Sequence, residues 1–259
     1  MFNPRPLSAT LFGTVAAAAI GLGSMTMADE FDLSNMSDDQ KAAFGEAVRA
    51  YLLKNPGVIF EAAALYEEQQ AAQQARADET LVADNLDALY NDGYSWVGGN
   101  PEGDITVVEF LDYRCGYCRK AHPEVAELIA KDGNIRLIVK EYPILGEGSL
   151  ISSRFAIATQ IVAGDEAYKA VHEALIAMKG NPGKGPLVRL AGTLGLDGDA
   201  IWAEMESEEV TRRISETRAL GQKMGINGTP SFAFGDQMVR GYVPLDSMLE
   251  IIAELRQNG

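Results

Sequence analysis

Two cysteines, Cys115 and Cys118, are the residues whose type and spacing most clearly point to chemistry. They are the only cysteines of the 259 residues, and they flank the dipeptide Gly116-Tyr117. A disulfide between them closes a loop of about four residues, which contributes only ~2 kcal/mol of loop entropy, against ~3 kcal/mol for fifteen residues. Stabilisation of the fold is therefore a weak reason for this bond. Thiol–disulfide exchange is the better interpretation.

Cys115 is expected to be the attacking thiol. An apolar run ends just before it and a helix is predicted just after it, so its sulfur should lie at a helix N-terminus. Unpaired backbone amides and the positive end of the helix dipole stabilise a thiolate there. Cys118, one turn further along, would be shielded and would act as the resolving thiol, which attacks a mixed disulfide at Cys115.

Two other uses of the cysteine pair remain open, an inert disulfide and a metal site. Two thiolates can hold Cu(I), but the chain has no second cysteine pair and only two histidines, His122 and His172. A zinc site is therefore not expected. No cofactor is expected either, apart from a redox-active disulfide between Cys115 and Cys118.

Glu109 lies within the apolar run, six residues before Cys115. On a buried strand, this carboxyl is either a structural acid, with Lys140 of a neighbouring strand as its charge partner, or the group that accepts the proton of Cys118. A pKa raised by burial would suit the second role. His122 is expected to be a solvated helix residue.

Residues 1–28 have the pattern of a secretory signal peptide. Arg5 supplies the positive region, residues 11–22 are apolar, and small residues occupy the positions read at a cleavage site after Ala28. A membrane anchor is the alternative, but the apolar run is shorter than the ~20 residues that a spanning helix needs. We expect cleavage after about Ala28 and export to the periplasm, where disulfides form and persist.

The charge of the chain argues against nucleic acid as a partner. There are 37 acidic and 22 basic residues, a net charge of −15 that becomes −16 when Arg5 leaves with the signal peptide. Phosphate contacts require clustered Lys and Arg, which this composition does not favour.

Residues 29–92 are predicted to form an N-terminal helical segment. Ser37, with Gln40 three residues later, has the pattern of a capping box. An apolar stripe follows, made of Phe44, Val48, Tyr51 and Leu52. Asn55-Pro56-Gly57 interrupts this helix, and a second helix is expected from Val58 through Leu89. The middle of the second helix lacks large apolar residues, so it is either a stalk, a hinge or a plain surface helix.

Residues 97–259 have the pattern of an α/β domain. Strands at 105–111 and 135–141, with a helix at 117–130 between them, make a βαβ unit that favours parallel pairing. An all-helical insertion is expected at about 149–225. Its predicted helices lie at 149–163, 166–178, 186–194 and 207–224. Strands at 231–235 and 238–240 and a closing helix at 245–255 complete the prediction.

Thr229-Pro230 directly precedes the first of these late strands. X-Pro bonds are cis only about one time in twenty in folded proteins, so the local sequence by itself predicts a trans bond.

Together these motifs resemble the thioredoxin superfamily, and within it the exported DsbA-like and DsbC-like thiol–disulfide oxidoreductases. The matching residues are 109–114 (Glu-Phe-Leu-Asp-Tyr-Arg), Cys115-Gly116-Tyr117-Cys118, Pro123 and Thr229-Pro230. The resemblance implies a thioredoxin-like fold with Pro230 as a cis-proline that faces the cysteines. It further implies that Thr229 offers backbone hydrogen bonds to a substrate chain. Glu109 would be the buried acid beneath the resolving cysteine.

Two features indicate which branch of the family the chain resembles. Gly116-Tyr117 between the cysteines and Thr229 before the proline are similar to the isomerase branch, whereas strong oxidants carry Pro-His and Val there. Residues 54–59 resemble ScsC-like proteins, whose N-terminal helices mediate self-association and whose family is linked to copper tolerance. The resemblance implies a disulfide isomerase or reductase that is homo-oligomeric through residues 38–90. Its partners would be exported cysteine-containing proteins and a membrane thiol-redox protein that keeps it reduced.

Two other functions remain open. The single long helical insertion looks DsbA-like, which would suit a monomeric disulfide-forming oxidase. The third possibility is a copper-binding or client-holding module, whose cysteines bind rather than react. The aromatic residues Tyr113, Tyr117 and Phe232 either form a client-binding surface or simply pack in the core.

Overall fold

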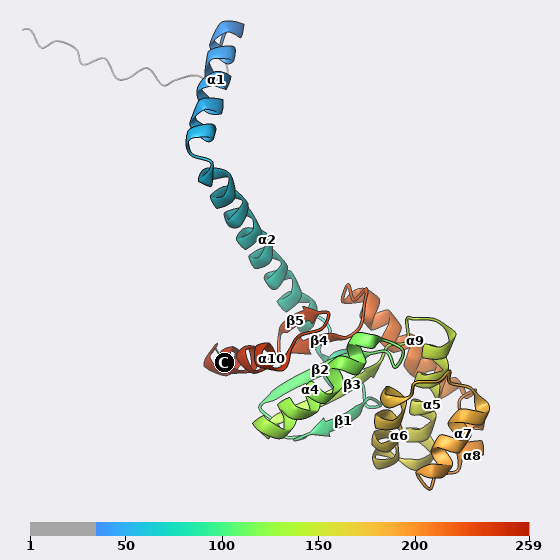
Figure 1. Ribbon diagram of the computed structural model, residues 1–259. Coiled ribbons are helices and arrows are strands. Elements are labelled where there is room, and N and C mark those ends of the chain that lie inside the picture. Colours follow the sequence, from blue (N-terminus) through green and yellow to red (C-terminus); the bar gives the residue numbers. More distant parts are fainter. Residues whose placement is uncertain (1–34, 259) are drawn as a thin grey trace, which may run out of the picture. The chain divides into compact units, whose positions relative to one another are not determined.

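The computed structural model describes residues 35–258 (Figure 1). The predicted signal peptide, with its cleavage after Ala28, lies outside the described residues. The chain divides into two compact units, residues 1–62 and residues 63–259. Within the described residues, no helix combines the length and the apolar character that crossing a bilayer requires.

The first unit contains helix α1 (Asp38–Lys54) and the start of helix α2 (Gly57–Ala83). Its predicted capping box is confirmed: Ser37 Oγ accepts from the Gln40 amide at 3.3 Å, and Gln40 Oε1 accepts from the Ser37 amide at 2.8 Å. The predicted break at Asn55-Pro56 is also present. No residue of α1 is buried, so the residues that the structure describes leave most of its apolar stripe exposed.

The expectation of one continuous helix as far as Leu89 is wrong. Helix α2 ends at Ala83, and a separate short helix, α3, spans Leu86–Tyr90. The side-chain amide of Asn85 donates to the Leu81 carbonyl at 2.6 Å, which satisfies a carbonyl that the helix end leaves unpaired. Leu89 of α3 is fully buried, so α3 belongs to the core of the second unit.

The second unit is built on a five-stranded sheet in the order β1-β3-β2-β4-β5. Its strands are β1 (Trp96–Gly99), β2 (Ile105–Leu111), β3 (Ile135–Glu141), β4 (Ser231–Phe234) and β5 (Gln237–Arg240). Strands β2 and β3 pair in parallel, as the βαβ pattern predicts, and the other pairs are antiparallel. Strand β1 was not predicted, because its glycines indicated only a turn; it forms a sheet edge along β3, with Trp96 opposite Val139.

Two apolar layers cover the faces of this sheet. One face packs against α4 (Gly116–Asp132), α10 (Leu245–Asn258) and part of the helical insertion. The opposite face packs against α3, the end of α2 and one face of α9 (Glu208–Lys223). The side chains of Val107 and Leu111 enter the first layer, and those of Val108 and Phe110 enter the second. This strict alternation explains why β2 reads as a continuous apolar run.

The helical insertion lies between β3 and β4 and gathers beside the sheet (Figure 1). Its helices are α5 (Glu147–Ala163), α6 (Asp165–Ala177), α7 (Lys184–Thr193), α8 (Gly198–Glu204) and α9. Helix α8 was not predicted, because seven residues are too few to show helical periodicity. Asp197 caps it by accepting from the Ala200 amide at 3.0 Å.

Candidate active site

Strand β2 and helix α4 place the cysteine pair at one end of the sheet. Cys115 is the N-cap residue of α4, in an extended backbone conformation, and Cys118 lies one turn further in. The first amides of α4 have no partner within the helix, and such a helix N-terminus favours negative charge near it. Cys115 retains 7% exposure, whereas Cys118 retains only 1%. The pair therefore has one sulfur at the surface of the helix tip and one beneath it.

The loop before β4 approaches Cys115 directly. Cys115 Sγ lies 3.0 Å from the carbonyl oxygen of Thr229, to which the thiol donates. The Thr229-Pro230 peptide bond is cis, contrary to the local expectation of trans and in agreement with what the family resemblance implied. Pro230 is buried and Thr229 is partly exposed. Residues 114 positions apart in the chain thus meet at one sulfur.

Asp112 holds this end of the sheet together, and sequence reasoning assigned it no role. It is fully buried. Its carboxylate accepts from the Arg114 amide at 2.8 Å and from the amides of Ile144 and Leu145 at 2.8 and 3.0 Å, while its carbonyl accepts from the Cys115 amide at 3.0 Å. The position of an aspartate between a predicted strand and a predicted helix start could have indicated this role from the sequence. Asp112 therefore fixes the backbone that carries Cys115.

The thiol of Cys118 is held in its protonated form. Burial raises the pKa of Cys118, and the charge of nearby Glu109 raises it further. The Asp112 amide donates to Cys118 Sγ at 3.5 Å, which opposes the shift. Cys118 can act as a nucleophile only after a nearby group has accepted its proton.

Glu109 is the candidate for the group that accepts the proton of Cys118. It lies in β2, is 4% exposed, and makes no side-chain hydrogen bond with any residue that the structure describes. Burial raises its pKa to about 8, and the charge of Glu141 contributes. Glu109 can therefore hold or release a proton near neutral pH, as a proton acceptor for Cys118 must.

The ion pair with Lys140, one of the two alternatives for Glu109, is absent. In the β2–β3 register Glu109 lies opposite Val139 and Lys140 lies opposite Phe110, so the two charged side chains leave opposite faces of the sheet. Lys140 instead donates to the Ala88 carbonyl at 2.7 Å and pairs with Asp92.

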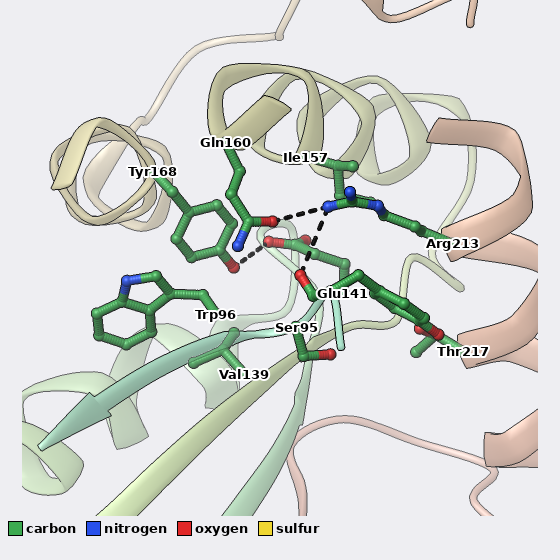
Figure 2. Close-up of a pocket in the computed structure, with 10 residues that line it drawn as sticks. Ser95, Trp96, Val139, Glu141, Ile157, Gln160, Tyr168, Arg213 and Thr217 are labelled. Atoms are coloured by element: carbon green, nitrogen blue, oxygen red, sulfur yellow. Dashed lines mark hydrogen bonds between the residues drawn. The ribbon is translucent and has the colours of Figure 1, made fainter. Parts of the chain in front are cut away.

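A second buried acid, Glu141 at the end of β3, was missed by sequence reasoning, although a charge at the end of an apolar strand was a signal. Glu141 Oε1 accepts from the Tyr113 hydroxyl at 2.7 Å. It also accepts from the Tyr168 hydroxyl at 2.6 Å, a bond that Figure 2 shows. The Tyr113 hydroxyl also lies 3.0 Å from Nδ1 of His172. Burial lowers the pKa of His172 to about 3, so its ring is neutral.

A cavity of about 200 Å³ lies beside Glu109, between the sheet and helices α4 and α6. Its polar lining consists of Glu109, His122, Lys169, His172 and Glu173. His122 is not simply solvated, because its Nε2 lies 2.7 Å from Glu173 and its ring lies 5.2 Å from the ring of His172. Within the part of the chain described here, no group of three or more His, Cys, Asp or Glu residues is arranged to hold a metal.

Of the three aromatic residues expected near the site, only Tyr117 reaches the surface. It is 63% exposed, and its ring lies 6.1 Å from that of Tyr242, whereas Tyr113 and Phe232 are buried. Gly116 is exposed and has open space where a side chain would project. The exposed surface at the motif is therefore Gly116, Tyr117 and the neighbouring Tyr242.

Comparisons with known protein families agree with this geometry. The model of the DSBA-like thioredoxin domain matches residues 106–253, which include the cysteine pair and the cis-proline. The model of the copper resistance protein ScsC N-terminal domain matches residues 40–73, which lie in α1 and α2.

Two solved structures are similar to this one. A thioredoxin-like oxidoreductase from Silicibacter pomeroyi DSS-3 is 44% identical, with a TM-score of 0.62, over 66% of this chain and 97% of that one. Proteus mirabilis ScsC in a transitional conformation is 25% identical, with a TM-score of 0.63, over 86% of this chain and 100% of that one. The second similarity extends beyond the α/β domain.

A curated relative is much longer than this chain. The Na⁺/H⁺ antiporter NhaA 1 of Salinispora arenicola is 28% identical over 59% of this chain, and the match spans 23% of the antiporter. The chain thus spans about a quarter of the length of the first curated relatives that it matches.

The family match covers more than half of the chain, including both cysteines and the cis-proline that faces Cys115. The chain therefore belongs to the DSBA-like thioredoxin domain family, and its N-terminal segment is of the ScsC type.

Proposed function

We propose that this protein is an exported thiol–disulfide oxidoreductase that acts as a disulfide isomerase or reductase on cysteine-containing proteins of the periplasm. The observation that carries the proposal is the position of Cys115. Its sulfur lies at the N-terminus of α4 and 3.0 Å from the Thr229 carbonyl, with the buried Cys118 one turn below. The predicted signal peptide supports export.

The first chemical step uses Cys115. Its thiolate attacks one sulfur of a client disulfide, forms a mixed disulfide with that sulfur, and releases the other client sulfur as a thiolate. The helix N-terminus stabilises the attacking thiolate. The Thr229 carbonyl becomes available to a client backbone amide when the Cys115 thiol no longer donates to it. The exposed Gly116-Tyr117 surface leaves room for the client chain.

The second step uses Cys118 and Glu109. Ionised Glu109 accepts the proton of Cys118, and the resulting thiolate attacks Cys115 of the mixed disulfide. A Cys115–Cys118 disulfide forms, and the client sulfur leaves as a thiolate that takes up a proton. This step reduces the client. In isomerisation, a client thiolate attacks the mixed disulfide instead, so a new client disulfide forms and Cys115 is regenerated. A membrane thiol-redox partner would keep the pair reduced.

The redox equilibrium of the cysteine pair tests the direction of this chemistry. We expect equilibration with glutathione to give a potential near about −180 mV or below, because the Gly-Tyr and Thr-Pro motifs resemble those of the isomerase branch. A value near about −120 mV would instead support a disulfide-forming oxidase. Quantification of the reduced and oxidised forms after alkylation gives the potential.

We further propose that the α1–α2 segment mediates self-association. On α1 the side chains of Phe44, Val48 and Tyr51 are exposed, although they form one apolar stripe. On α2 Ile59 and Phe60 are exposed as well. Apolar residues at helical spacing that remain uncovered within one chain suit packing between copies. Joining several catalytic domains would raise the concentration of active sites around one misfolded client.

A charge placed in the α1 stripe tests the self-association. We expect Val48→Glu to reduce the molar mass measured by light scattering to that of a monomer, because a carboxylate would be buried between helices. Ala50→Glu introduces the same side chain on α1 about 200° around the helix from Val48, and it should leave the mass unchanged. Equal masses for Val48→Glu and the unmodified protein would contradict the proposed interface.

A further inference from the structure

Two buried carboxyls face the same side of the sheet. The register of β2 and β3 places Glu109 opposite Val139 and Leu111 opposite Glu141, so Glu109 and Glu141 are diagonal neighbours on one face. A diagonal of one strand spacing and two residues of rise separates their backbone positions by roughly 8 Å. Both side chains are at most 5% exposed.

The surroundings of Glu141 supply hydrogen-bond donors: Figure 2 shows the Tyr168 hydroxyl donating to Glu141, while Arg213 donates to Gln160. Tyr113 and Tyr168 donate to Oε1, and Oε2 is buried without a hydrogen-bond partner among the described residues. The titratable and charged residues that face Glu141 are Asp112 and Tyr113 after β2, Tyr168 and His172 of α6, Tyr94 before β1, and Arg213 of α9.

The one cation in this group is engaged elsewhere. Arg213 donates to Glu209 at 2.7 Å, to Gln160 at 3.0 Å and to the Tyr94 carbonyl at 3.5 Å. Lys140 leaves the opposite face of the sheet, and His172 is neutral. On the Glu109 side, the charged and titratable residues that line the cavity are His122 and Glu173, which pair with each other, and Lys169, whose side chain is exposed. Glu109 and Glu141 are like charges in one weakly solvated space, and ionisation of one opposes ionisation of the other.

We propose that Glu141 is a positioning residue that acts through Glu109: its charge determines at which pH Glu109 can take the proton of Cys118. The inference rests on the proposed function, because it concerns the resolving step of that reaction. Burial raises the pKa of Glu141 to about 7, and the two tyrosine hydroxyls oppose this shift. Glu141 thus gains its charge in the pH range in which Glu109 must be ionised to act.

The experiment follows the two steps separately with an aromatic disulfide, 5,5′-dithiobis(2-nitrobenzoate). Attack by Cys115 releases one coloured thiolate and forms a mixed disulfide. Attack by Cys118 on that disulfide releases the second thiolate and leaves the Cys115–Cys118 disulfide, so two electrons pass from the protein to the reagent. Stopped-flow absorbance gives the rates of both phases across the pH range.

Glu141→Gln keeps an oxygen that can accept from both tyrosines but removes the charge. The pH midpoint of the second phase should move down by roughly one unit, and the second phase should be roughly fivefold faster at about pH 7. The first phase should keep its pH profile, because Cys115 does not pass its proton to Glu109. Glu141→Asp restores a charge and should move the midpoint back towards that of the unmodified protein.

Glu173→Gln is the matched control. It makes the same chemical change on a half-exposed carboxyl that lines the Glu109 cavity and pairs with His122, and it should leave the midpoint in place. Tyr168→Phe covers the case in which Glu141→Gln does not fold. It removes one donor to Glu141, so Glu141 keeps its proton to higher pH and the midpoint of the second phase should move down by a smaller amount.

The outcomes separate this inference from the proposed function. The role of Glu141 is overturned if the second phase has the same pH midpoint in the unmodified protein and in a folded Glu141→Gln or Tyr168→Phe variant. That result leaves the redox function intact. Absence of any Cys115-dependent reaction in the unmodified protein overturns the proposed function itself.

Discussion

Replacing Cys118 with alanine will convert the protein into a trap for its clients. Cys115 remains at the helix N-terminus and can still attack a disulfide, but the sulfur that releases the product is gone. The mixed disulfide should therefore accumulate, and reduction of client disulfides should slow by roughly three orders of magnitude. A non-reducing gel of the variant mixed with scrambled ribonuclease would show the conjugate as a band that reducing agent removes.

Cys115→Ala is the matched control for this trap. It leaves Cys118, which is 1% exposed and whose pKa burial raises, and which should not react with a client directly. We expect neither a conjugate nor refolding of scrambled client. If the Cys115→Ala variant still refolds the client, the cysteine pair does not carry the activity, and a client-holding role becomes the better explanation. If the Cys118→Ala variant forms no conjugate, the assigned order of attack is wrong.

Replacing Glu109 with glutamine will stabilise the reduced protein at high pH. Burial raises the pKa of Glu109 from its usual 4.5 to about 8, so the folded state holds this proton more tightly than the unfolded chain does. This proton on Glu109 stabilises the folded state fully at pH values below the pKa that Glu109 has in the unfolded chain. The stabilisation is lost as pH rises through the pKa that Glu109 has in the folded state. Glutamine imitates the protonated acid, so the variant should gain up to about 5 kcal/mol in free energy of unfolding at about pH 9.

Urea denaturation across pH measures this difference. Near pH 4 both proteins carry a neutral group at position 109, so their free energies of unfolding should agree closely. The difference should open as pH rises from about 5 to about 9. Glu250→Gln, on the exposed part of α10, makes the same change where no burial cost exists and should show no such divergence. A constant difference at all pH values would mean that Glu109 is not buried as a neutral acid.

The stability and the activity of Glu109→Gln should change in opposite directions. Glutamine cannot accept the proton of Cys118, so the resolving step should slow while the fold becomes more stable. An uncompensated carboxyl in the core lowers stability, and the proposed role of Glu109 in proton transfer would account for that cost.

The sequence by itself determined most of the helices and strands, and it singled out Cys115 and Cys118 as the pair predicted to react. The βαβ unit, all four predicted insertion helices to within two residues at each end, and the capping box of α1 follow from patterns within about twenty residues. Such patterns report local hydrogen bonding and the periodicity of a buried face. The Cys-X-X-Cys spacing likewise identifies redox chemistry from four neighbouring residues, because a disulfide that closes so short a loop contributes little to stability.

The partners of the charged residues were decided only by the tertiary structure. Pairing of Lys140 with Glu109 was one of two alternatives that the sequence left open. One residue of register separates opposite faces of a sheet, and the sequence does not state which strand residue lies opposite which. Glu141 escaped attention for the same reason: its two tyrosine donors come from the turn after β2 and from α6. Strand β1 is a glycine-rich segment that is extended because it pairs with the edge of β3, and the local sequence does not show that pairing.

The local sequence around Thr229-Pro230 predicts a trans bond, and only the resemblance to a family indicated otherwise. The cis bond is found where the loop before β4 reaches Cys115, which lies 114 residues earlier in the chain. Local patterns follow from interactions between neighbours along the chain, whereas proton acceptors, countercharges and sulfur contacts depend on which distant segments the sheet brings together. For that reason the sequence alone could predict which thiol attacks, and only the folded chain could show what surrounds it.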